Sequence, residues 1–292
     1  MREKNDPKSM ALMALAMAIF GTIGIFRKMI PLSSAWVAFF RGAIGSLFLI
    51  LFVLAGRKQR KGQGFDKATT AKLVISGALI GINWALLFEA YNWTSVSIAT
   101  LCYYMAPTFV IVLSCVLLHE KMTWLKAACT TAAFAGMVLV SGVLDADSVS
   151  KADTRGILFG LGAAVLYASV VLTNKTIKAA EPFKKTIIQL TAATIVLIPY
   201  LILKDGMPDV KWNAEIIALL ITVGIVHTGL SYALYFGSMD GLRTHTVALF
   251  SYIDPVTALI LSAVLLHEEL TMLGIAGAVL ILGSAVISGL KE

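Results

Sequence analysis

The chain has 292 residues, of which 58% are apolar and only 14% charged, and its formal net charge is +7. A soluble domain of this size needs a far more charged surface, so the composition excludes an ordinary globular protein. About twenty consecutive apolar residues are enough to cross a bilayer as a helix. The sequence therefore predicts an all-α membrane protein that crosses the lipid bilayer many times.

Apolar runs follow one another along the whole chain, mostly with very short loops between them. Longer polar stretches fall near 55–70, 144–154 and 204–213. The opening residues, MREKNDPKS, are too polar for the core of a signal peptide, so we expect the first helix to stay in the mature protein. Ten transmembrane helices are predicted, at residues 10–29, 32–54, 71–91, 95–118, 124–143, 155–175, 184–203, 214–237, 244–267 and 271–290.

Lysine and arginine are unevenly divided between the two sides of these predicted helices. With the N-terminus in the cytoplasm, most of the 24 basic residues fall on the cytoplasmic side. The positive-inside rule then predicts a multi-pass protein of the cytoplasmic membrane with both termini in the cytoplasm. The densest basic run, RKQRK at 57–61, is explained as an anchor on anionic lipid, and nucleic acid is not an expected partner.

A His-Glu pair occurs twice, in LLHEKMT (117–123) and LLHEELT (265–271). A zinc protease places its second histidine four residues after the first, but Thr123 and Thr271 occupy those positions. The three cysteines have no CxxC spacing, and no GxxxxGK[ST] phosphate loop occurs. We therefore expect no enzyme activity, no metal site and no cofactor.

Internal repetition gives the His-Glu pair another meaning. The segments YMAPTFVIVLSCVLLHEKMT (104–123) and YIDPVTALILSAVLLHEELT (252–271) are identical at 10 of 20 positions. Each pair then closes a helix, and Thr123 and Thr271 are expected to cap the helices that follow, with the glutamate near that N-terminus. A role of the pair in gating or proton relay is the alternative.

Two repeats of five helices follow from this pattern. Five is an odd number, so the second repeat must enter the membrane inverted relative to the first, as in many secondary transporters. The predicted units are a first repeat at 1–143, an external linker at 144–154 and an inverted second repeat at 155–292.

A proline-centred helix, then LL-x-E-x-x-T, then a small-residue helix, twice in one chain, resembles the drug/metabolite transporter superfamily, EamA type. The resemblance covers about residues 10–290 and is specific for the fold but loose for the substrate. It implies export or exchange of small metabolites through a cavity lined mostly by helices one, three, four, six, eight and nine. Pro107, Glu120, Asp254, Pro255 and Glu268 match the family pattern, whereas Ala106 departs from it.

Ionisable side chains within membrane helices usually face a cavity or a partner. Asp254 lies roughly 15 Å from the inner end of its predicted helix, near the midplane, and we predict that it couples cation or proton movement to transport. A salt bridge with Arg41 that only fixes packing is the alternative. Glu89 is a second coupling candidate, although its place near the outer end of its helix also suits an interfacial role. His227 is central in helix eight, where a packing role is the alternative.

Aromatic and polar residues away from the helix ends form the predicted substrate site. Together with a nearby carboxylate they suit an ammonium group, through cation–π attraction. His227, Ser231 and Tyr235 are spaced to share one face of a regular helix. Hydrogen bonding between helices is the alternative role for the tyrosines. The predicted substrate-binding residues are Asn83, Trp84, Tyr103, Tyr104, His227, Ser231, Tyr232, Tyr235 and Tyr252.

The sequence predicts a secondary active transporter that moves a small polar metabolite, such as an amino acid, an amine or a related solute, by alternating access. It would work as an exporter or a proton-coupled antiporter. A uniporter or exchanger without ion coupling is the main alternative, and a membrane-embedded enzyme or a channel is less favoured. Pro107 and Pro255 should interrupt their helices, because proline removes a backbone donor. Monomer and dimer both remain open.

Overall fold

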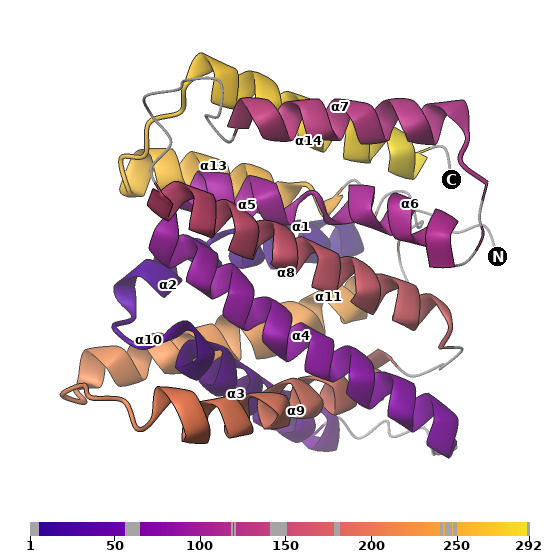
Figure 1. Cartoon of the computed structure of the whole chain (residues 1–292). Coiled ribbons are helices and arrows are strands. Elements are labelled where there is room, and N and C mark those ends of the chain that lie inside the picture. Colours follow the sequence, from indigo (N-terminus) through magenta and orange to yellow (C-terminus); the bar gives the residue numbers. More distant parts are fainter. Residues whose placement is uncertain are drawn as a thin grey trace.

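The computed structural model of the chain describes residues 6–55, 65–117, 119, 121–140, 151–177, 182–239, 242, 247 and 250–290. Every regular element within these residues is a helix (Figure 1). The basic run at 57–61, Glu120 and most of the predicted linker at 144–154 lie outside the described residues.

Seven helical segments are long and apolar enough to span a membrane, and three further apolar helices are shorter. Several predicted helices consist of two or three consecutive elements. In chain order, the elements are α1 (Pro7–Gly21), α2 (Ile23–Met29), α3 (Ser34–Ala55), α4 (Lys67–Trp93), α5 (Val96–Tyr103), α6 (Ala106–Leu117), α7 (Trp124–Val140), α8 (Lys151–Lys175), α9 (Pro182–Tyr200), the π-helix η1 (Leu201–Asp205), α10 (Ala214–Gly224), the π-helix η2 (Ile225–Leu230), α11 (Ser231–Met239), α13 (Ile253–Leu265) and α14 (Met272–Leu290).

Local sequence signals explain where several helices begin. The side chains of Asp66, Ser95 and Asn213 accept hydrogen bonds from backbone amides three residues ahead, at 2.8–3.2 Å, and so cap α4, α5 and α10. Hydrogen bonds from Thr69 hold the pKa of Asp66 below its usual value. These caps satisfy amides that have no partner within the helix itself.

The predicted interruptions at the two repeated prolines are confirmed. A turn at Tyr104–Met105 separates α5 from α6, and Pro107 is the second residue of α6 (Figure 1). In the second copy, a turn at 251–252 precedes α13, and Pro255 is the third residue of that helix. Because a proline has no amide hydrogen, the first turn of a new helix is where it is best tolerated.

Two histidines in the same position of the repeat have the same unusual backbone. His119 and His267 have φ angles of 55° and 53°, and no other non-glycine residue of the described part has a positive φ. Each follows a helix and reverses the chain direction in the left-handed conformation typical of helix C-termini. The predicted threonine caps are confirmed, because Thr123 accepts from the Lys126 amide at 3.3 Å and Thr271 from the Gly274 amide at 3.0 Å.

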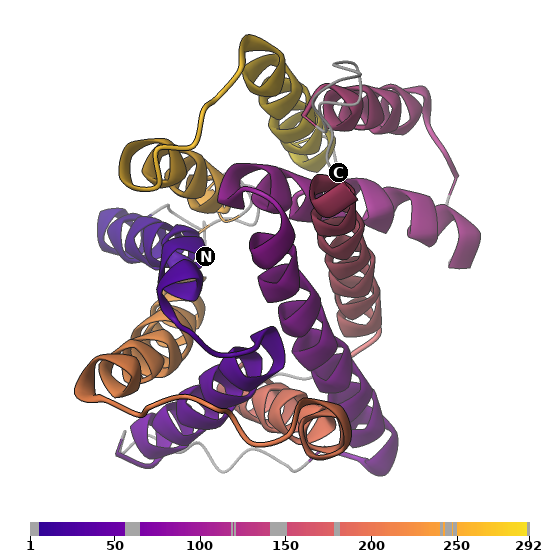
Figure 2. The same cartoon turned by 60° about the vertical axis from the view of Figure 1, so that its left-hand side comes forward.

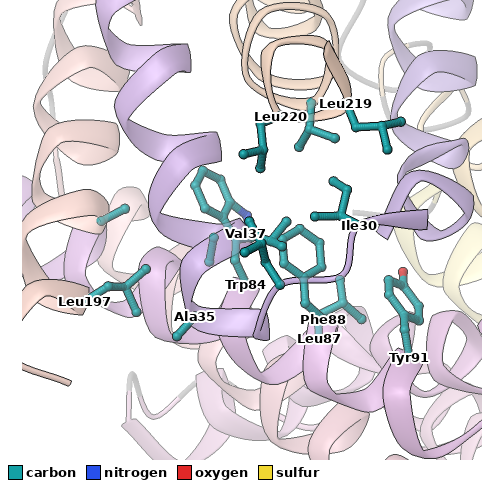
Figure 3. Packing of buried hydrophobic residues seen from close by; sticks show 14 of the residues in the cluster. Ile30, Ala35, Val37, Trp84, Leu87, Phe88, Tyr91, Leu197, Leu219 and Leu220 are labelled. Atoms are coloured by element: carbon teal, nitrogen blue, oxygen red, sulfur yellow. The ribbon is translucent and has the colours of Figure 1, made fainter. Parts of the chain in front are cut away.

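Helix α4 runs through the middle of the molecule, packed along α8 on one side and along α9 on another (Figures 1 and 2). Trp84, Phe88 and Tyr91 from α4 meet side chains of α3 and α10 in the largest cluster of buried apolar residues (Figure 3). At one edge of the molecule, α7 and α14 lie side by side. Glycine at position 136 allows this close contact, because a Cβ atom there would lie only 2.7 Å from the carbonyl oxygen of Gly277.

Candidate functional site

Four tyrosines from three separate regions of the chain lie close together in the structure. The rings of Tyr103 and Tyr104, at the end of α5, are 5.9 Å apart, and Tyr167 of α8 is 5.6 Å from Tyr103. Tyr232 of α11 is within electrostatic range of both Tyr103 and Tyr167. We call these four residues the tyrosine cluster. Each keeps part of its surface accessible.

Asp254 lies beside the tyrosine cluster in the first turn of α13. Its carboxyl group interacts with the side chain of Tyr104 and, electrostatically, with the positive charge of Arg41. Within the described residues, no basic nitrogen approaches its oxygens to within 4.0 Å, so the packing salt bridge with Arg41 considered from the sequence is not formed. The N-terminal end of a helix favours a negative charge, which helps this position to hold a carboxylate.

Arg41 is buried on α3 with only 6% of its surface exposed. Its Nε donates a hydrogen bond to the Thr228 hydroxyl at 2.9 Å, and its guanidinium carbon lies 4.2 Å from the centre of the Trp84 ring. The face of an indole ring attracts a cation, so Trp84 holds the guanidinium group from one side. Trp84, which was predicted to bind substrate, therefore contacts the buried guanidinium group of Arg41.

The predicted transmembrane helix at 214–237, which comprises α10, η2 and α11, does not present His227, Ser231 and Tyr235 on one regular face. That expectation is therefore wrong. Residues 225–230 form the π-helix η2, in which the hydroxyl group of Ser231 bonds to the carbonyl of Val226, five residues back. A π-turn holds more residues than an α-turn and therefore rotates the following side chains. His227 faces α1 instead, with its Nε2 2.7 Å from the Thr22 hydroxyl oxygen.

Three further predicted residues take other contacts. Asn83 is buried and donates to the Ala163 carbonyl at 2.5 Å, which joins α4 to α8. Tyr235 packs against Phe236, with ring centres 5.1 Å apart, beside the residues of α1. Tyr252 occupies the turn before α13, two residues from Asp254. The structure therefore brings together Tyr103, Tyr104, Tyr232, Tyr235 and Asp254, with Trp84 joined to them through Arg41. It gives separate surroundings to Asn83, His227 and Ser231.

Glu89 belongs to a polar cluster at the end of α4. Its carboxylate accepts hydrogen bonds from the Ser34 hydroxyl at 2.6 Å, the Trp93 indole at 2.8 Å and the Asn92 amide at 3.0 Å. The Arg27 guanidinium group donates to Ser34 and Asn92 in the same cluster. Because its oxygens already have these partners, Glu89 has the contacts of a structural residue that joins α3 to α4.

Glu268 of the second repeated segment forms hydrogen bonds with α5, a contact that the repeated sequence pattern does not predict. Its carboxylate accepts hydrogen bonds from the amides of Val96 and Ser97, at 2.7 and 3.0 Å, and from the Ser97 hydroxyl at 2.8 Å. The Ser97 hydroxyl is also 2.6 Å from that of Ser262. We call this set the Glu268 clamp. The glutamate was expected to favour the start of the next helix, α14, but it lies at the N-terminus of α5, whose free amides it satisfies.

Two grooves lie apart from the tyrosine cluster. One, of about 430 Å³, is lined only by side chains of α4 and α9. The other, of about 280 Å³, runs between α1, α2, α10, η2 and α13 and is lined by Thr22, Thr222, His227 and Thr257 among apolar residues. The side chains of the first are almost all apolar, as expected for a surface against lipid tails. Neither groove is lined by a carboxylate of the described residues, so we place the candidate site at the tyrosines and Asp254, where a carboxyl group and aromatic rings meet.

Sequence reasoning did not assign several residues around the cluster to the substrate site. Thr228 could not be assigned without the π-helix, and Tyr167 was not among the residues predicted to bind substrate. Arg41 belongs to helix two, which the family resemblance does not place among the cavity helices. Their common signal was a polar or charged side chain in an apolar helix, which is costly without a partner.

The apolar helices and the absence of strands from the described residues define a multi-spanning membrane protein. The chain belongs to the EamA-like transporter family, whose model matches residues 7–142 and 154–290. It is 30% identical to the uncharacterized transporter YxxF of Bacillus subtilis (strain 168) over 261 residues, which are 89% of this chain and 83% of that protein.

An uncharacterized transporter of Archaeoglobus fulgidus is 25% identical over 284 residues, covering 95% of each chain. One solved structure, described only as a crystal structure of a protein, superposes with a TM-score of 0.64 at 17% identity and covers 98% of this chain and 99% of its own. That likeness extends to the fold alone. The chain is thus a transporter by family, and its substrate and mechanism are matters for proposal.

Proposed function

We propose that the protein is a secondary active transporter that moves a small polar metabolite bearing an amine, such as an amino acid or an amine, by alternating access. One observation carries this proposal: Asp254 borders the tyrosine cluster, and its carboxylate has no cation within 4.0 Å in the described part of the chain. A carboxylate beside aromatic rings attracts an ammonium group. A substrate amine would supply the missing partner.

The proposal includes ten transmembrane helices arranged as two inverted repeats, with both termini in the cytoplasm. Three shorter apolar helices accompany the seven long segments, and the family model matches the two halves of the chain separately. The matching turns at His119 and His267 also support a duplicated design. With this orientation the start of α5 and the end of α13 face the outside, as does the Glu268 clamp.

Alternating access requires a contact that closes one side and opens when the other closes. The Glu268 clamp joins α5 of the first repeat to α13 of the second through three hydrogen bonds. We assign it the role of the closed external gate. Its bonds connect elements that must separate if a solute is to pass between the outside and the tyrosine cluster.

Asp254 is proposed to bind either a proton or the substrate amine, but not both at once. Competition for one carboxylate is the minimal arrangement for antiport of a proton and a cationic group. Replacing Asp254 with asparagine keeps the shape of the side chain and removes its charge. Uptake driven by a pH gradient into proteoliposomes should then be lost, whereas exchange of substrate across the membrane can persist.

Asp209→Asn is the matched control, because Asp209 is an exposed aspartate in the loop before α10. It should leave pH-driven uptake at the wild-type level. Full pH-driven uptake by Asp254→Asn would reject the coupling role of Asp254. An absence of pH dependence in the wild-type protein, together with saturable transport, would instead identify a uniporter or an exchanger.

A further inference from the structure

The second charged group beside the tyrosine cluster is Arg41, and no carboxylate in the described part of the chain forms an ion pair with it. Its surroundings differ sharply from those of Arg27, the other buried arginine. The Nη atoms of Arg27 donate to Ile30, Ser34 and Asn92, and Glu89 provides a negative charge nearby. Both Nη atoms of Arg27 therefore have partners within their own cluster, whereas its buried Nε has none in the described part of the chain.

Arg41 has a single protein hydrogen bond in the described residues, from Nε to Thr228. No carboxylate oxygen of these residues lies within 4.0 Å of its guanidinium group. Neither Nη atom is among the fully enclosed polar atoms without a partner, so both retain accessible surface. Arg41 thus has N–H donors without a partner in the described residues, although only 6% of the surface of the whole residue is exposed.

The position of the guanidinium group is fixed from two directions. Trp84 lies 4.2 Å from its carbon atom and Phe88 lies 5.6 Å from it, both on α4, and Figure 3 shows these two rings next to each other. Thr228 holds Nε from the side of η2, and its own hydroxyl donates to the Val223 carbonyl at 3.1 Å. Arg41 is therefore held in place before any ligand arrives, which lowers the entropic cost of binding.

Arg41 and Asp254 border the same tyrosines without pairing with each other. Arg41 is within electrostatic range of Tyr103, Tyr232 and Asp254. Opposite charges in a poorly solvated interior attract strongly, so they would pair if their side chains could meet. Trp84 and Thr228 contact the guanidinium group of Arg41, which borders the same tyrosines as Asp254 without pairing with that carboxylate in the described part of the chain.

We propose that Arg41 binds the carboxylate of the substrate and selects amino acids or similar zwitterions over amines that lack a carboxylate. The planar fork of a guanidinium group offers two parallel N–H donors to the two oxygens of a carboxylate. Asp254 would bind the amine end of the same molecule. This inference rests on the proposed transport function and specifies which substrates that function serves.

The test compares uptake of paired substrates by purified protein in proteoliposomes. Each pair consists of an L-amino acid and the amine left by removal of its carboxylate, such as phenylalanine and phenethylamine or leucine and isopentylamine. The wild-type protein should prefer the amino acid of the transported pair. In Arg41→Gln, amino acid uptake should fall about 10- to 100-fold, because hydrogen bonds to charged groups contribute that much, while amine uptake changes less than about 3-fold. Arg41→Lys should lie between.

Arg155→Gln is the matched control, since Arg155 also lies against an indole ring, with its guanidinium carbon 4.8 Å from the centre of the Trp93 ring. It should leave the preference unchanged. If Arg41→Gln does not fold, Thr228→Val provides the test. That variant keeps the charge, removes the partner of Nε, and should reduce the preference for the amino acid.

Two outcomes would overturn the inference and are distinguishable from each other. Equal transport of both members of a pair by the wild-type protein, or an unchanged preference in Arg41→Gln and Thr228→Val, rejects the role of Arg41 and leaves the proposed transport of amines intact. Transport of neither member of any pair by the wild-type protein rejects the proposed function together with the inference.

Discussion

Replacing Glu268 with glutamine should weaken the contact between α13 and α5. The carboxylate accepts three hydrogen bonds, from the amides of Val96 and Ser97 and from the Ser97 hydroxyl. A glutamine keeps one acceptor oxygen and turns an amide donor toward the other N–H group, and it has no charge for the helix terminus. Hydrogen bonds to charged groups contribute about 1.5–3 kcal/mol and neutral ones about 1 kcal/mol. We therefore expect a loss of about 2 kcal/mol, since the site is partly exposed.

A loss of that size should shift the ratio of closed to open external gates about 30-fold toward the open form, because each 1.4 kcal/mol is a factor of about ten. A cysteine at Thr100, one turn beyond Ser97 on α5 and only 4% exposed, reports this opening. The three native cysteines are first replaced by alanine. The rate of labelling by a membrane-impermeant thiol reagent, added outside, should rise in Glu268→Gln.

Glu269→Gln is the control for charge, because Glu269 is the exposed neighbour of Glu268. It should leave the labelling rate of the cysteine at position 100 unchanged. If Glu268→Gln labels at the same rate as Glu269→Gln and the parent protein, the clamp does not keep this side closed and its role as a gate is wrong.

Two further predictions concern the same end of the molecule. Cysteines at Ser97 and Ser262, whose hydroxyl oxygens are 2.6 Å apart, should form a disulfide under oxidation and stop transport until a reductant is added; transport at the full rate after verified cross-linking would contradict a moving gate. His267→Gly should increase the free energy of unfolding by about 0.5–1 kcal/mol, because glycine adopts the φ of 53° without steric cost. The thermal unfolding midpoint measured in detergent should rise accordingly. His267→Val should lower it, and the reverse order would show that the backbone turn does not limit stability.

Features that depend on a few neighbouring residues could be predicted from the sequence. The helix breaks beside Pro107 and Pro255 follow from a missing amide hydrogen, and the caps at Thr123 and Thr271 follow from a hydroxyl group before an apolar helix. The apolar helices themselves follow from the cost of exposing apolar surface to water. Each of these causes acts within one or two helical turns.

Features that depend on distant partners could not be predicted in this way. The Glu268 clamp connects residues 171 and 172 positions apart, and no periodicity marks such a pair. The π-helix at Ile225–Leu230 changes the register of the predicted helix at 214–237. The position of His227 predicted for a regular α-helix was therefore wrong. The sequence places Arg41 in an apolar helix, but only the structure shows that Trp84 and Thr228 contact its guanidinium group and that no pair with Asp254 is formed in the described residues.

Counterflow in sealed proteoliposomes tests most directly the claim that this chain is a secondary transporter. Vesicles containing the purified protein are loaded with an unlabelled amino acid or amine, and uptake of the same labelled solute is followed. We predict saturable uptake that is accelerated by the internal substrate and greatly reduced when the disulfide between positions 97 and 262 is formed. Uptake that rises linearly with concentration and ignores the internal solute would identify a channel, and chemical conversion of the label would identify an enzyme. Either result would contradict the account.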